Sequence, residues 1–196
     1  MPRLLAKLRM LITAWLLRRI VWGLERRGRY REAEEKLLQL LSRVEKWSDT
    51  PEKHEVIAFI KTRLANIESY KGNYDRALAY AREALRHAER AGSTIEAGRA
   101  HLIAAVHYNA GRLDKAYEAL ARAQAALARG DTEPYLQARA WSKMLESRIL
   151  LARGDKEGAL RALHEAKKLS TKIKSREPLL EKIAETEDRI NRGFSG

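Results

Sequence analysis

The sequence contains no cysteine and few of the residues that interrupt helices. Without cysteine the chain forms no disulfide, uses no thiol in catalysis and has none of the cysteine ligands that hold structural zinc. It has only four prolines and eleven glycines in 196 residues, and no stretch shows the strict apolar and polar alternation of a half-buried strand. Alanine, leucine, arginine, lysine and glutamate predominate, and these favour helices. We therefore expect an all-α fold.

Long apolar runs are also missing. The longest is far shorter than the roughly 18 residues that a membrane-spanning helix needs, so we expect no transmembrane helix. The short apolar segment 10–17 ends in Arg18 and Arg19 and has no small-residue cleavage site behind it, so a secretory signal is not expected either. We expect a cytoplasmic protein, with peripheral contact at a membrane as the alternative.

The sequence offers no recognisable catalytic or metal-binding pattern. None of the five histidines forms the helical pair, four residues apart with a glutamate between, that a zinc protease site requires. Phosphate-binding glycine loops and the nucleophile motif of serine hydrolases are absent too. Glu83 and His87 lie four residues apart and are expected to form a solvated ion pair. We therefore expect no enzyme, no cofactor and no bound metal.

Positive charge gathers at the start of the chain. The net charge is +13, and residues 1–31 hold nine basic residues against the single acid Glu25. Residues 4–16 place their apolar side chains at helical spacing, which predicts a basic amphipathic helix. It could be a capping or first repeat helix, an interfacial anchor on anionic lipid, or a segment that docks into a partner's groove. The candidate membrane or anion-binding residues are Arg3, Lys7, Arg9, Trp15, Arg18, Arg19 and Trp22. A second basic cluster covers 167–176.

One short pattern occurs four times along the chain. A glycine is followed by a bulky residue two positions later and by an alanine five positions later, at Gly28, Gly72, Gly111 and Gly154. The glycines are 44, 39 and 43 residues apart, a spacing that indicates a repeat architecture. Glycine adopts the left-handed conformation that ends a helix, and Asn73 and Asp155 stand where an N-cap belongs. Each pattern therefore predicts a helical hairpin.

These residues resemble the tetratricopeptide repeat, whose helix pairs carry a glycine at the turn, a tyrosine two residues later and an alanine five residues later. Tyr30 and Tyr74 match the tyrosine, while Leu113 and Lys156 replace it. The spacing of about 40 residues exceeds the usual repeat of about 34 and suggests a long-helix variant. The resemblance implies a right-handed α-solenoid of antiparallel helix pairs, with about four repeats and a terminal capping helix.

Glycines, prolines and capping residues also predict where the helices begin and end. Residues 1–14 are expected to form the basic N-terminal helix, 15–176 the repeat domain, and 177–196 the capping helix and tail. Inside the repeat domain, Thr50 and Pro51 predict a helix start, and Gly92 predicts a helix end. Ser93 to Glu96 form a predicted capping box. Expected helices include 29–47, 74–91 and 113–129.

The resemblance also implies a function. Such stacks offer a concave groove lined by the first helix of each pair, and the corresponding candidate partner-binding residues are Asn66, Ser69, His101, Tyr108, Trp141, Met144 and Arg148. The leading hypothesis is a non-enzymatic adaptor or scaffold that binds a partner peptide or helix. The alternative is an electrostatic binder of anionic membrane or nucleic acid through the basic N-terminal helix. Assembly with further copies of the chain is a third possibility.

Overall fold

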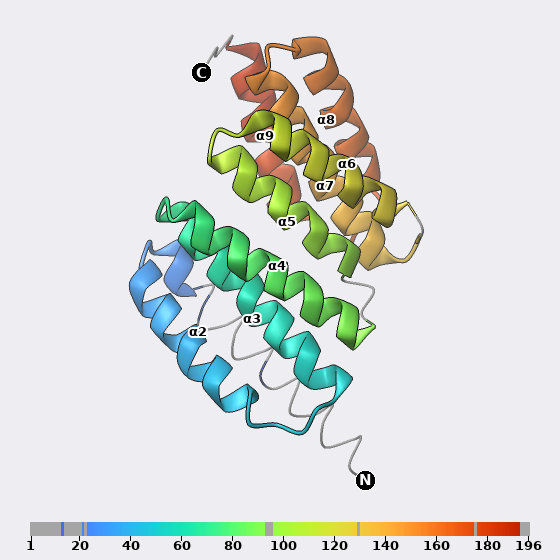
Figure 1. The fold of residues 1–196 in the computed structure, drawn as a ribbon. Helices are drawn as coiled ribbons and strands as arrows, with labels where there is room; N and C mark the ends of the chain where they lie inside the picture. Colours follow the sequence, from blue (N-terminus) through green and yellow to red (C-terminus); the bar gives the residue numbers. More distant parts are fainter. Residues whose placement is uncertain are drawn as a thin grey trace. The chain divides into compact units, whose positions relative to one another are not determined.

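The structure is a computed structural model, and it describes residues 13, 21, 23–92, 96–128, 130–174 and 176–192, with the backbone alone for 96–100. In these ranges the regular structure is α-helical and contains no strand, which confirms the all-α prediction. The helices with defined bounds are α2 (Tyr30–Val44), α3 (Pro51–Tyr70), α4 (Tyr74–Ala91), α5 (Glu96–Asn109), α6 (Leu113–Leu127), α7 (Glu133–Ala152), α8 (Lys156–Ser170) and α9 (Glu177–Asn191) (Figure 1).

The predicted helix start at Pro51 and helix end at Gly92 agree with the structure, whereas α6 ends at Leu127, two residues earlier than predicted. The side-chain oxygen of Thr50 accepts a hydrogen bond from the Lys53 amide at 3.3 Å, and Pro51 is the first residue of α3. Proline fits there because its missing amide has no helical partner at that position. α4 ends at Gly92, whose φ is 59°. The predicted capping box at 93–96 rests on residues 93–95, which lie outside the described residues.

Four turns have the same backbone geometry. The turn glycines Gly28, Gly72, Gly111 and Gly154 have φ values of 68°, 81°, 70° and 85°. At each turn, the residue after the glycine donates its amide to a carbonyl five residues back, at 2.8 to 2.9 Å, as from Asn73 to Glu68. The glycine amide itself donates three residues back, at 2.9 to 3.2 Å. This is the Schellman arrangement, which satisfies the last carbonyls of a helix.

The alanine that follows each turn is buried. Ala33, Ala77, Ala116 and Ala159 are all fully buried, at 0% exposure. A methyl side chain lets a neighbouring helix approach more closely than a larger one would. In α4, Ala81, Ala84 and Ala88 continue the buried side, and α3 and α4 run side by side (Figure 1). The recurring pattern therefore encodes a reversal of the chain and a small contact residue behind it.

Of the two N-caps expected from the sequence, the structure contains one. Asp155 Oδ1 accepts a hydrogen bond from the Gly158 amide at 2.8 Å, so this cap is confirmed. Gly158 leaves room for it, because a Cβ there would collide with the Asp155 carboxylate. The prediction for Asn73 is wrong. Its side chain makes no cap hydrogen bond and instead donates from Nδ2 to Glu68 Oε2 at 3.0 Å.

Replacing Asp155 with alanine is expected to lower the free energy of unfolding by about 1 kcal/mol, because the Gly158 amide loses its acceptor. Urea denaturation followed by circular dichroism measures this difference. Asp155→Asn is the matched control, since asparagine keeps the accepting oxygen and is expected to recover most of the loss. Equal losses in both variants would contradict the capping role.

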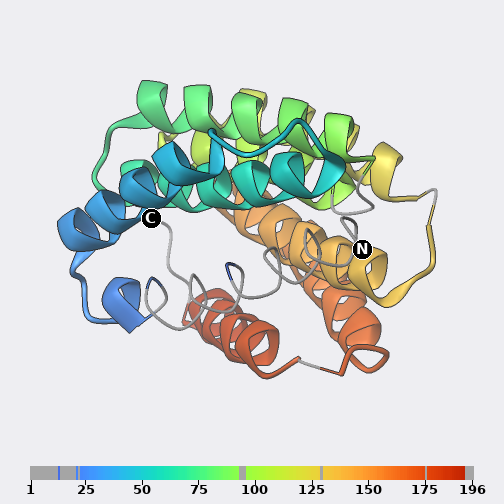
Figure 2. The same ribbon diagram turned by 90° about the horizontal axis from the view of Figure 1, so that it is seen from below.

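The chain divides into two compact units, residues 1–96 and 97–196. In the first, the core joins Leu24 to Leu37 of α2 and Leu64 of α3. In the second, one apolar cluster joins α5, α6 and α7, and another joins α7, α8 and α9. Figure 2 shows α7 and α8 running side by side. Within the described ranges, no helix combines the length and apolar character that crossing a bilayer requires.

Candidate functional site

The structure places the predicted partner-binding residues on three helices. Asn66 and Ser69 lie on α3 in the first unit, and the others lie on α5 and α7 in the second. Asn66, His101, Tyr108, Trp141 and Arg148 are half-buried. They therefore remain candidates for contact with a partner.

Ser69 and Met144 differ from that expectation. They are only 5% and 6% exposed, so neither side chain is open to a partner in this structure. Met144 follows Ala140 by one helical turn and packs in the same cluster, with Leu163 of α8. The rotation of α7 against α8 decides this placement, and the turn pattern contains no information about it.

Four of the half-buried residues form what we call the α5–α7 strip, made of His101, Tyr108, Trp141 and Arg148. Residues seven apart in a helix lie on the same face, which relates His101 to Tyr108 on α5 and Trp141 to Arg148 on α7. The two helices meet where the Arg148 guanidinium carbon lies 4.9 Å from the centroid of the Tyr108 ring. Tyr108 also packs on the cluster that contains Ile149.

Arg148 differs from most of the buried and half-buried basic side chains that the structure describes, such as Lys61 and Arg63. Lys61 forms an ion pair with Glu83, and Arg63 forms one with Glu25. Arg148 makes no ion pair with the side chains that the structure describes, and its recorded contact is the face of Tyr108. A cation over an aromatic ring gains about 0.5–2 kcal/mol, but the guanidinium keeps donors that suit a carboxylate. The α5–α7 strip therefore has an aromatic part and an unneutralised cationic part.

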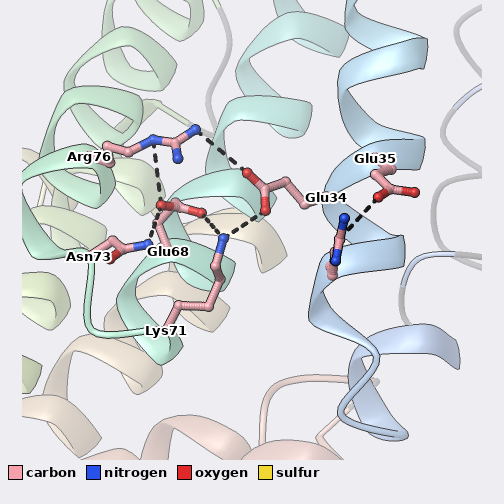
Figure 3. Close-up of polar contacts among 7 residues, drawn as sticks. Glu34, Glu35, Glu68, Lys71, Asn73 and Arg76 are labelled. Carbon is pink, nitrogen blue, oxygen red and sulfur yellow. Dashed lines mark hydrogen bonds and ion pairs between the residues drawn. The ribbon is translucent and has the colours of Figure 1, made fainter.

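A polar cluster in the first unit surrounds the buried carboxylate of Glu68, which is 0% exposed (Figure 3). Lys71 Nζ lies 2.7 Å from Glu68 Oε1 and 2.7 Å from Glu34 Oε2. Asn73 donates to the other Glu68 oxygen at 3.0 Å, and Arg76 approaches both carboxylates at 3.5 Å. We call these five residues the Glu68 cluster. It ties α2, α3 and the start of α4 together beside Gly72.

Charge and burial act in opposite directions on Glu68. Burial raises the pKa of its carboxyl group, but hydrogen bonds from Lys71 and Asn73 and the charges of Lys71 and Arg76 outweigh burial, so the pKa is lowered overall. The pKa of Lys71 is raised, mainly by its hydrogen bonds to Glu34 and Glu68. Both groups therefore stay ionised near neutral pH, and both Glu68 oxygens are occupied. The cluster is suited to holding helices together rather than to proton transfer.

A histidine pair was not anticipated from the sequence. The expected ion pair between Glu83 and His87 is wrong, because Glu83 pairs with Lys61 and His87 Nδ1 lies 2.8 Å from His54 Nδ1. The other ring nitrogen of His54, Nε2, lies 2.9 Å from Asp49 Oδ1. His54 and His87 stand at comparable distances before and after Gly72, so an antiparallel hairpin places them side by side. This spacing in the sequence could have predicted their contact.

The surroundings of His87 disfavour its charged form. Burial, the neighbouring His54 and the positive charges of Lys61 and Arg90 lower the pKa of His87 to about 4. A shallow hollow beside the pair is lined by Asp49, Thr50, Pro51, His54 and Arg90. Among the residues that the structure describes, no three histidine, aspartate or glutamate side chains are gathered to hold a metal ion.

The basic candidates divide between undescribed and exposed positions. Arg3, Lys7, Arg9, Trp15, Arg18, Arg19 and Trp22 lie outside the described residues. In the second cluster, Lys167 pairs with Glu187 at 3.3 Å. Lys168, Lys172 and Arg176 are exposed and form no ion pair with the side chains that the structure describes. The alternative of an anion-binding helix at 1–14 stays a prediction.

In comparisons with protein-family models, with curated proteins and with solved structures, the chain matched none of them.

Proposed function

We propose that this chain is a non-enzymatic adaptor that binds a segment of a partner protein on the α5–α7 strip. The observation that carries this proposal is Arg148, a half-buried cation that stacks on Tyr108 and has no carboxylate partner among the described side chains. A cation that is partly withdrawn from water is stabilised by an acidic partner. A partner that supplies the carboxylate would complete the arrangement.

The proposal includes a repeat architecture. We infer that the helix pairs are units of one tetratricopeptide-like, right-handed solenoid of about four repeats. Support comes from the shared Schellman geometry at Gly28, Gly72, Gly111 and Gly154 and from the fully buried alanine five residues after each. A solenoid presents long helix faces, and proteins of this architecture use them for binding.

The chemistry of the strip indicates what the partner segment carries. Tyr108 and Trp141 are half-buried aromatic residues, and aromatic and arginine residues supply most of the energy at many interfaces. Arg148 favours an aspartate or glutamate, which can accept two hydrogen bonds from a guanidinium. We therefore propose a segment that combines an acidic side chain with an apolar one.

Peptides selected from a random library for binding to the full chain should be enriched in acidic residues near a leucine or an aromatic residue. For such a peptide, Arg148→Ala is expected to weaken binding by about 10- to 100-fold, because a charged hydrogen bond is lost. Fluorescence anisotropy measures the dissociation constant, and thermal unfolding checks that the variant folds. Arg148→Lys is expected to restore only part of the affinity, since lysine lacks the planar group.

Arg122→Ala is the matched control, because Arg122 lies on α6 in the same unit, is exposed and pairs with Glu118 at 3.7 Å. It should leave binding unchanged. The adaptor proposal fails if selected peptides bind the Arg148→Ala variant as tightly as the unchanged protein. Binding that is lost on removing residues 1–13, but is insensitive to Arg148, would favour the electrostatic alternative.

A further inference from the structure

The His54 and His87 rings face each other with their Nδ1 atoms only 2.8 Å apart. Two nitrogens at this distance form a hydrogen bond only if one carries the proton and the other accepts it. Asp49 Oδ1 lies 2.9 Å from His54 Nε2 and can only accept when ionised, which assigns a proton to Nε2. In neutral His54 the Nδ1 atom is then the acceptor. His87 is therefore the donor, through its Nδ1–H.

This arrangement tolerates one added proton but not two. A proton added to His54 Nδ1 reverses the hydrogen bond, and His87 then accepts it as the other neutral tautomer. A second proton places N–H groups on both facing atoms and a positive charge on both rings. The hydrogen bond cannot form in that state, and like charges at this separation repel. The doubly protonated pair must therefore separate.

Among the residues that the structure describes, four charged side chains lie around the pair. Asp49 comes from the loop before α3, Lys61 from α3, and Glu83 and Arg90 from α4 itself. Lys61 is already paired with Glu83, so Asp49 is the carboxylate that contacts the rings directly. His54 is only 9% exposed, which limits access of water to the contact.

The pair lies at the end of the α3–α4 hairpin opposite the Gly72 turn. The turn end is held by the Glu68 cluster, whose carboxylate stays ionised because its pKa is lowered. His54 follows the first residue of α3 by three positions, and His87 precedes the C-cap Gly92 by five. The unit boundary follows at 96–97. Loss of the histidine contact would thus free the end of α4 while the turn stays closed.

We propose that the His54–His87 contact is a proton-sensitive latch that closes the open end of the α3–α4 hairpin and releases it in mildly acidic conditions. The closed state resists protonation of His87, whose pKa is lowered from 6.5 to about 4. In the open state, His87 takes up a proton at the ordinary histidine pKa of 6.5. The stability of the closed state is therefore full above about pH 6.5 and falls as the pH drops towards 4, by up to about ten-fold per pH unit for one proton.

Hydrogen exchange on the full chain tests the latch. Between pH 7 and 4.5, and after correction for the intrinsic exchange rate, amides in 56–60 and 84–90 are expected to lose protection by up to about ten-fold per pH unit. Amides in 64–70 and 77–81, next to the turn, are expected to keep it. Protection that does not change with pH, or that falls equally at both ends of the hairpin, would overturn the proposal.

His87→Gln removes the titrating ring and keeps an amide that can donate to His54. This variant should lose the pH dependence at the open end, whereas His164→Gln, at an exposed position on α8, should retain it. An unchanged pH response in His87→Gln would overturn the latch. Nitrogen-15 spectra of the unchanged protein at pH 7 give a test without substitution: we expect Nε2–H on His54 and Nδ1–H on His87, and Nε2–H on both neutral rings would contradict the proposal.

Discussion

Replacing Glu68 with alanine is expected to lower the free energy of unfolding by about 2–3 kcal/mol, because hydrogen bonds to a charged, buried carboxylate are lost. Glu68 is fully buried, and its two oxygens contact Lys71, Asn73 and Arg76. Without it, Lys71 keeps Glu34, Arg76 keeps Glu34 and Tyr80, and the Asn73 amide loses its acceptor. Urea denaturation at pH 7, followed by circular dichroism, measures the loss.

Glu35→Ala provides the control for Glu68→Ala. Glu35 lies next to Glu34 on α2 (Figure 3) and pairs with Arg31 at 3.4 Å on the surface. Exposed pairs contribute about 0–1 kcal/mol, so this variant should be nearly neutral. Equal losses for Glu68→Ala and Glu35→Ala would refute a stabilising role for the Glu68 cluster.

The effect of Glu68 should also depend on pH. Because the pKa of Glu68 is lowered from 4.5 in the folded chain, its ionised form contributes full stability above about pH 4.5. That contribution is lost as the pH falls through the folded value. The difference between Glu68→Ala and the unchanged protein should therefore shrink below pH 4.5. A difference that stays constant would mean that packing, rather than charge, dominates.

Replacing Ile149 with alanine is expected to destabilise the second unit by about 3–4 kcal/mol, as for other large-to-small changes in tightly packed cores. Ile149 is 0% exposed and packs with Ala104, Leu120 and Leu145 from α5, α6 and α7. The change removes apolar contacts and leaves a cavity that three helices would have to move to fill. Denaturation by urea, monitored by circular dichroism, provides the measurement.

The neighbouring residue provides the comparison for Ile149→Ala. Arg148→Ala removes a half-buried side chain of the same helix. The free energy of unfolding should fall by only about 1 kcal/mol, which is the energy of the contact between Arg148 and Tyr108. Ile149→Ala is thus expected to affect mainly stability, and Arg148→Ala mainly partner binding. A loss below about 1 kcal/mol for Ile149→Ala would show that the cluster collapses around the cavity.

The helices and turns were predictable because local chemistry determines them. Gly72 needs a positive φ, Pro51 suits a first helical residue, and Asp155 can reach the Gly158 amide whatever the rest of the chain does. These devices act within about one helical turn, so a single sequence contains the information. The all-α class followed from the same local preferences.

Contacts between helices were not predictable in the same way. Asn73 has the residue type and position of an N-cap, but a buried carboxylate one turn earlier competes for its side chain. His87 was matched with Glu83 on its own helix, whereas the register between α3 and α4 brings it to His54. Met144 is buried because of the way α7 rotates against α8. Register and rotation depend on many side chains together, and no short pattern encodes them.

The Schellman turns have a consequence for how a chain of this kind can change its length. Each reversal is made by main-chain hydrogen bonds within six consecutive residues, from the carbonyl at Glu68 to the amide at Asn73 in the case of Gly72. A duplicated or deleted block of about 40 residues, the distance from one turn glycine to the next, therefore brings or removes a complete reversal. No compensating change is needed elsewhere in the backbone. Whole helix pairs are thus the natural unit of insertion and loss, and engineered chains with an added pair can be built by copying such a block.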